Sequence, residues 1–117
     1  MNTYEKILKQ EIAKRYQVEE KDSINRIASD YKTWAKAVVA GKRTKVQKSD
    51  WNTPEENRFW TLAVLAELRK KHADRMTINL SEVPGEITWR DLNVLADEYM
   101  IELYKVASPY QLVFLYN

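Results

Sequence analysis

The sequence predicts a mainly α-helical protein: a compact domain of four helices in which the third is enclosed by the others. The 117 residues include only two glycines and three prolines. Few positions therefore suit sharp turns, which favours long helices over many short strands. Apolar side chains also recur at helical spacing in four separate segments. Because this length suits a single hydrophobic core, we expect residues 1–117 to form one domain.

The first two predicted helices are amphipathic. Residues 3–17 carry apolar side chains one helical turn apart, at Tyr4, Leu8, Ile12 and Tyr16. Asp22 or Ser23 can cap a second helix. The apolar stripe of this second helix consists of Ile24, Ile27, Ala28, Tyr31, Trp34, Ala35 and Val38. Gly41 follows where a left-handed C-terminal cap is needed, so we expect the helix to end there.

The third helix begins with the clearest local signal in the chain. Thr53 is a capping residue, Pro54 suits the first helical position, and Glu56 can close a capping box. Residues 59–66 have no charge, and their apolar side chains cover nearly every direction around the helix. A helix that is apolar all round must be covered by its neighbours. We therefore expect this helix, which runs to about Arg75, to be the central one.

A fourth helix is predicted from Trp89 to about Val106, with Thr88 as its capping residue. Its apolar stripe consists of Leu92, Leu95, Ala96, Tyr99, Leu103 and Val106. The tail 111–116 is rich in β-prone residues and can pair with 77–83 as a short two-stranded β-ribbon. Such a ribbon needs a helix beneath it to be stable.

The clearest asymmetry of charge is a run of basic residues with no acid between Asp30 and Asp50. It contains Lys32, Lys36, Lys42, Arg43, Lys45 and Lys48. One interpretation is a solvated helix end, because cations are favourable near a helix C-terminus. The other is a contact with an anionic partner, such as an acidic protein surface or phosphates. The later part of the chain is acidic, and the sequence leaves open whether the opposite charges meet within the fold.

Sequence-specific DNA recognition is not expected from this basic run. A helix-turn-helix motif needs a short turn and an exposed polar recognition helix, whereas here a long connection leads into an apolar helix. Non-specific contact with phosphates, with Trp51 stacking on a base, is the most that these residues support.

The fourth predicted helix carries a second candidate face. It comprises Val94, Glu98, Ile101, Glu102 and Tyr104. A helix with two apolar sides must bury both of them. Either the β-prone tail covers this second side, or the side is a docking or self-association face, which would make the protein a homo-oligomer such as a homodimer.

The inventory of reactive residues favours a non-enzymatic protein. The chain has no cysteine, one histidine, His72, and no glycine-rich phosphate loop. We therefore expect no catalytic residue, no metal, no other cofactor and no small-molecule substrate. The absence of cysteine fits a cytoplasmic location, and no apolar run has the length of a membrane span, so no membrane partner is expected.

Two functions remain as hypotheses. The first is a small cytoplasmic adaptor or inhibitor that binds a macromolecular surface through the basic segment and the mixed apolar and acidic helix. The alternative is a nucleic-acid-binding protein without sequence specificity that contacts phosphates through residues 32–48.

Overall fold

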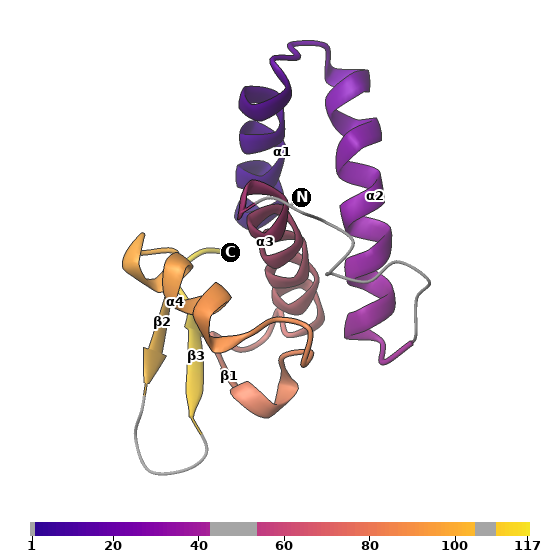
Figure 1. Ribbon diagram of the computed structural model, residues 1–117. Coiled ribbons are helices and arrows are strands. Elements are labelled where there is room, and N and C mark those ends of the chain that lie inside the picture. Colours follow the sequence, from indigo (N-terminus) through magenta and orange to yellow (C-terminus); the bar gives the residue numbers. More distant parts are fainter. Residues whose placement is uncertain (1, 43–53, 105–109) are drawn as a thin grey trace.

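The computed structural model describes residues 2–42, 54–104 and 110–117. These residues form four α-helices, a short 3-10 helix and a small three-stranded antiparallel sheet (Figure 1). The mainly helical class is confirmed. The expected two-stranded ribbon is incomplete, because a third strand joins it.

Helices α1 (Thr3–Tyr16) and α2 (Lys21–Val39) follow the predicted stripes. The start of α2 was wrongly predicted, because the helix begins before Asp22 with Glu20 as its N-cap. Its end agrees with the prediction: Gly41 has a φ of 76° and donates to the Val38 carbonyl, which closes a left-handed cap.

Helix α3 (Pro54–Lys71) packs against both α1 and α2 and supplies much of the core (Figure 1). Its residues from Phe59 to Arg69 are all buried, as expected for a segment with apolar side chains on nearly every side. The helix ends at Lys71 rather than near Arg75. Two buried residues near its end, Glu67 and Arg69, are charged. The Arg69 guanidinium donates to the carbonyls of His72 and Arg75 at 2.8 Å. This side chain therefore satisfies backbone groups that follow the end of the helix.

The sheet consists of β1 (Thr77–Asn79), β2 (Ile101–Tyr104) and β3 (Gln111–Phe114), in the order β1-β3-β2. Ile78 and Leu103 both face Leu112, which fixes the register on either side of β3. The predicted pairing of 77–83 with 111–116 is therefore correct for β1. After β1 the chain forms the 3-10 helix η2 (Leu80–Glu82) instead of a longer strand.

Helix α4 (Trp89–Asp97) is much shorter than predicted. The Thr88–Asp91 capping box opens it as expected. It ends because Tyr99 adopts a left-handed conformation with a φ of 60° and the Met100 amide donates to the Leu95 carbonyl. The following residues then form β2, so the prediction of a helix extending to Val106 is wrong.

Candidate functional site

The predicted basic segment is only partly within the described structure. Arg43, Lys45, Lys48 and Trp51 lie outside the described residues. Lys32 and Lys36 lie on α2, and Lys42 is exposed just after its end. Of this segment, the structure therefore describes Lys32, Lys36 and Lys42.

Lys32 pairs with an acid from α1. Its Nζ lies 2.6 Å from Oε1 of Glu5, whose side chain is only 10% exposed. Burial by itself would raise the pKa of Glu5, but the hydrogen bond and the charge of Lys32 hold that pKa below its ordinary value. One charge of the basic run is thus neutralised within the fold, and its partner comes from the first helix rather than from the fourth.

Other lysines from α1 and from the end of α3 lie near these two α2 lysines. We call the combined set the lysine face. Its members are Lys6, Lys9, Lys32, Lys36, Lys70 and Lys71. The face unites three segments that are far apart in the sequence.

The lysine face surrounds three open hollows in the surface. The α1–α3 hollow, of about 740 Å³, is lined by Asn2, Thr3, Glu5, Lys6, Lys32, Arg69, Lys70, Ala73 and Asn117. The α1–α2 hollow, of about 370 Å³, is lined by Lys9, Asn25, Ser29, Lys32, Thr33 and Lys36. The α2–α3 hollow, of about 380 Å³, is lined by Lys36, Val39, Ala40, Glu67, Lys70 and Lys71.

Each pair of hollows shares one lysine. Lys32 lines the α1–α3 and α1–α2 hollows, Lys36 the α1–α2 and α2–α3 hollows, and Lys70 the α1–α3 and α2–α3 hollows. The three hollows therefore adjoin one another and form a single continuous surface.

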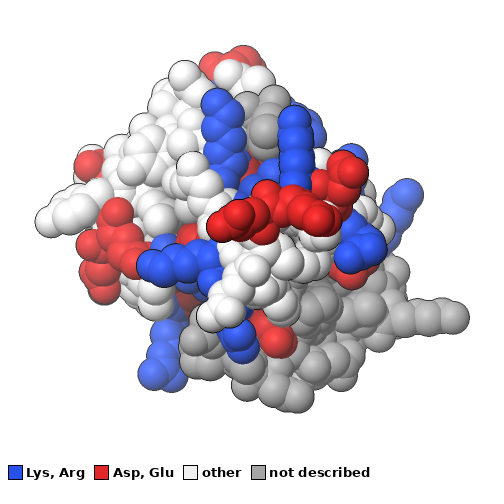
Figure 2. Space-filling view, turned by 90° about the horizontal axis from the view of Figure 1, so that it is seen from above, with Lys and Arg blue, Asp and Glu red and all other residues white. Residues whose placement is uncertain are grey.

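The lysine face has a large excess of positive charge. Among the described residues, seven basic and two acidic side chains line the three hollows. Both acids face a lysine: Glu5 pairs with Lys32, and Glu67 lies 3.7 Å from Lys70. By contrast, Figure 2 shows acidic and basic side chains intermixed at the end of the molecule where α1 connects to α2. The excess of one sign is therefore a property of the lysine face and not of every surface.

The predicted second face does not exist as one helical surface. Val94 lies on α4 and is 48% exposed, whereas Ile101 lies in β2 and is only 1% exposed. Ile101 belongs to the core and pairs with Phe114 of β3, so the tail covers this residue and it is not part of a docking face. Glu98, at the end of α4, pairs with Arg58 of α3. Glu98 thus joins two elements of the fold.

The remaining two residues of the predicted second face lie in β2. Glu102 and Tyr104 are exposed on the outer side of the strand, and the Tyr104 hydroxyl donates to the Glu102 carboxylate. That hydrogen bond raises the pKa of Tyr104. These two residues contact each other, but Ile101 lies on the opposite, buried side of the strand.

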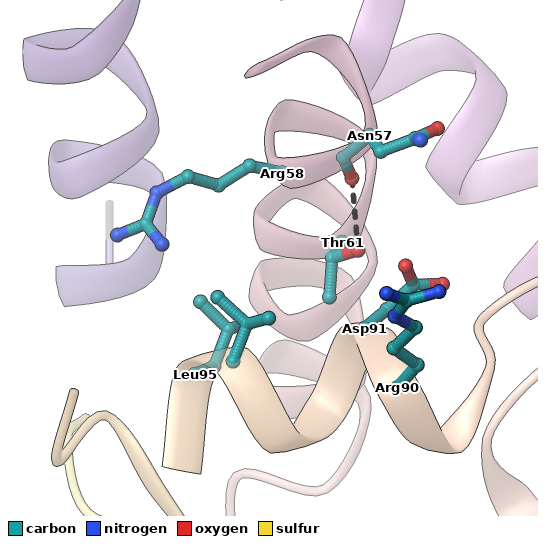
Figure 3. A pocket seen from close by; sticks show the side chains of 7 residues that line it. Asn57, Arg58, Thr61, Arg90, Asp91 and Leu95 are labelled. Atoms are coloured by element: carbon teal, nitrogen blue, oxygen red, sulfur yellow. Dashed lines mark hydrogen bonds between the residues drawn. The ribbon is translucent and has the colours of Figure 1, made fainter. Parts of the chain in front are cut away.

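A further hollow of about 370 Å³ lies between α3 and α4 (Figure 3). Several of its polar groups already have structural partners. The Thr61 hydroxyl donates to the Asn57 carbonyl at 2.9 Å, Arg58 binds Glu11 and Glu98, and Asp91 caps α4. Few groups therefore remain to define a chemistry for this hollow.

His72 forms a cluster with Arg75 and Glu82. The Arg75 guanidinium lies 2.8 Å from Nδ1 of His72, which must accept because arginine only donates. Nε2 then carries the proton of the neutral ring, 3.8 Å from Glu82. No group of three or more potential metal ligands occurs in the described ranges. The contacts of His72 and Arg75 with Glu82 link the residues that follow α3 to η2.

Sequence reasoning identified two of the six lysines of this face. Lys6 and Lys9 lie one turn apart on α1, as do Lys32 and Lys36 on α2, so helical spacing was an available signal. The contribution of α3 had no such signal, because it depends on how the helices pack.

No protein-family model matches this chain, and comparisons with curated proteins and with solved structures give no significant match. In the part of the chain that the structure describes, no helix is both long and apolar enough to cross a bilayer.

Proposed function

We propose that this protein is a small non-enzymatic interaction protein, an adaptor or inhibitor, that binds an acidic surface of a protein partner through the lysine face. One observation carries the proposal: three helices bring their lysines to three adjoining hollows, which share Lys32, Lys36 and Lys70. A concave surface with an excess of one sign of charge attracts and orients a partner of the opposite sign.

The unpaired lysines supply most of the expected affinity. Lys6, Lys9, Lys36 and Lys71 have no acid within ion-pair distance in the described ranges. A single exposed ion pair is worth only about 0.2–1 kcal/mol, so binding requires several of these lysines to act together. The contact is therefore expected to weaken as salt is raised towards physiological strength, where the screening length is about 8 Å.

The lining of the hollows favours a protein partner over a nucleic acid. Proteins that bind single strands combine positive charge with aromatic side chains on which bases stack. None of the described residues that line the three hollows is aromatic. Glu5 and Glu67 also lie within the face, so its positive charge is interrupted where a nucleic acid would present a continuous row of phosphates. The separate acidic side chains of a protein partner can instead be placed away from Glu5 and Glu67.

The test uses a fluorescent peptide of alternating Glu and Ser, with duplex and single-stranded DNA of matched charge as competitors. We compare the Lys9→Glu/Lys36→Glu double variant with the control Lys14→Glu/Lys21→Glu. Both make the same change in net charge, but Lys14 and Lys21 do not line the three hollows. The first variant should lose at least about tenfold in affinity, and the control much less.

Two results would contradict the proposal. Equal losses of affinity for the peptide in both double variants would show that only the net charge of the protein matters. Tighter binding of either DNA than of the peptide at the same salt would instead support the nucleic-acid alternative. Thermal unfolding of each variant checks that the fold is intact.

A further inference from the structure

We infer that the α1–α3 hollow is an anchor for a phosphorylated side chain, such as phosphoserine, on the partner protein. This inference deepens the proposed function and rests on it, because the phosphate is taken to be carried by that partner. It assigns one part of the lysine face to a specific chemical group.

The charge inside this hollow exceeds what a single carboxylate would neutralise. Lys6, Lys32, Arg69 and Lys70 line it with one acidic side chain, Glu5, and Glu67 lies 3.7 Å from Lys70. A phosphate monoester carries about −1.5 to −2 charges at neutral pH and offers three strong acceptor oxygens. It can therefore accept from several of these donors at once, which a carboxylate does less well.

The buried Arg69 is the most unusual residue of the hollow. It is 6% exposed, and in the described ranges no acid lies within ion-pair distance of it. A buried guanidinium without a counter-ion is costly unless its N–H groups are satisfied. The N–H groups of Arg69 have acceptors, but none of these acceptors is an acid, so its positive charge can still stabilise an anion that enters the hollow.

The acceptors of the Arg69 guanidinium differ in strength. Nε and Nη1 donate to backbone carbonyls at 2.8–3.1 Å. Nη2 has the poorest partners, the Met76 sulfur at 3.1 Å and the Asn117 side-chain oxygen at 3.3 Å. A thioether is a weak acceptor. A phosphate oxygen would be a much better partner for Nη2 than either of these.

The N-terminus of α1 adds to the positive potential of the hollow. Asn2 and Thr3, at the start of the helix, belong to the lining. The amides of Thr3 and Glu5 already donate to Asn117 and Asn2. These two amides are therefore occupied, and the helix contributes through its dipole.

The experiment measures binding of three fluorescent acidic peptides that differ only at the central residue, which is Ser, phosphoserine or Glu. The phosphoserine peptide should bind about tenfold more tightly than the Ser peptide, and the Glu peptide should fall between them. Inorganic phosphate should compete with the phosphoserine peptide better than sulfate does at equal ionic strength.

Matched variants show which hollow is responsible for the preference for phosphoserine. Lys6 lines only the α1–α3 hollow among the three, and Lys71 lines only the α2–α3 hollow. Lys6→Gln should remove most of the preference for phosphoserine, whereas Lys71→Gln should weaken all three peptides and keep the preference. Ala73→Glu, which adds an acid at an exposed position of the same hollow, should also abolish the preference.

Each outcome separates this inference from the proposed function. Binding of all three peptides with equal affinity would overturn the phosphate anchor and leave the proposed function standing. Equal loss of preference in Lys6→Gln and Lys71→Gln would also overturn it. If no peptide binds, the proposed function fails. In that case, direct binding of inorganic phosphate to the wild type, lost in Lys6→Gln, would still support an anion site in this hollow. If inorganic phosphate does not bind either, both the proposed function and the phosphate anchor are overturned.

Discussion

Lys32 Nζ lies 2.6 Å from Glu5 Oε1, and this ion pair joins α2 to α1 at the border of two hollows of the lysine face. The same lysine thus has a structural partner and a place in the candidate site. Because Glu5 is mostly buried, the pair is expected to matter for stability more than an exposed ion pair would.

Replacing Lys32 by methionine should destabilise the protein at neutral pH. The substitution leaves the Glu5 carboxylate, with a side chain 10% exposed, without its hydrogen-bond partner. We expect a loss of about 1–3 kcal/mol in the free energy of unfolding, measured by urea denaturation at pH 7. The control Lys36→Met, at an exposed residue without an ion pair in the described ranges, should change stability by less than about 0.5 kcal/mol.

The cost of Lys32→Met should depend on pH. The pKa of Glu5 is lowered in the folded protein, so its stabilising contribution is present above the ordinary glutamate pKa of about 4.3 and is lost as pH falls through the folded value. Wild type and variant should therefore approach equal stability in acid. A difference that stays constant from neutral to acidic pH would contradict this account of the pair.

Ile101→Asp should unfold the protein. Ile101 is 1% exposed and pairs with Phe114 across the sheet, so an aspartate there is a buried charge without a partner. We expect a loss of more than about 4 kcal/mol, measured by chemical denaturation and circular dichroism. Val94→Asp, at a residue 48% exposed on α4, is the matched control and should remain folded. A folded Ile101→Asp protein would show that the β2 assignment is wrong.

Tyr99→Gly should stabilise the protein. Tyr99 has a φ of 60°, which is unfavourable for a residue with a Cβ atom, and its side chain is 80% exposed, so little packing is lost. We expect a gain of about 0.5–1 kcal/mol in thermal or urea unfolding. The same change at Tyr104, which lies in β2 with ordinary strand geometry, should instead lower stability. Loss of stability in both variants would argue against the left-handed cap.

Tyr4 should ionise only in strong alkali. Burial raises its pKa to about 12, and its hydroxyl donates to the Met100 carbonyl at 2.7 Å. A raised pKa means that its contribution to stability is full below the ordinary tyrosine pKa of about 10 and is lost as pH rises towards 12. Stability measured across this range should fall in wild type and fall less in Tyr4→Phe. An equal fall in both proteins would contradict this role of Tyr4.

The first three helices could be predicted from the sequence because local signals decide them. Pro54, Gly41 and the apolar stripes act within a few residues of one another. The fourth helix was overextended because residues 98–104 continue an apolar pattern that fits a helix as well as a strand. The pairing of β2 with β3, which decides the outcome, is a contact between distant segments. No glycine marks the cap, because Tyr99 occupies the left-handed position.

The candidate site was predicted only in part for a similar reason. The charge run in the sequence identifies Lys32 and Lys36, but not their neighbours in space. Lys70 joins them because α3 packs against both α1 and α2. The predicted face on the fourth helix does not form, because Ile101 lies in β2 and is buried in the core. Sites formed by several elements therefore need the fold before they can be assembled.

The most direct test of the central claim is to map the binding surface by titrating ¹⁵N-labelled protein with the acidic Glu-Ser peptide. We predict that the changes in amide chemical shift will be largest around Lys9, Lys36 and Lys70, on the three helices that carry the lysine face. Changes concentrated on α4 and β2, with the lysine face unaffected, would contradict the account.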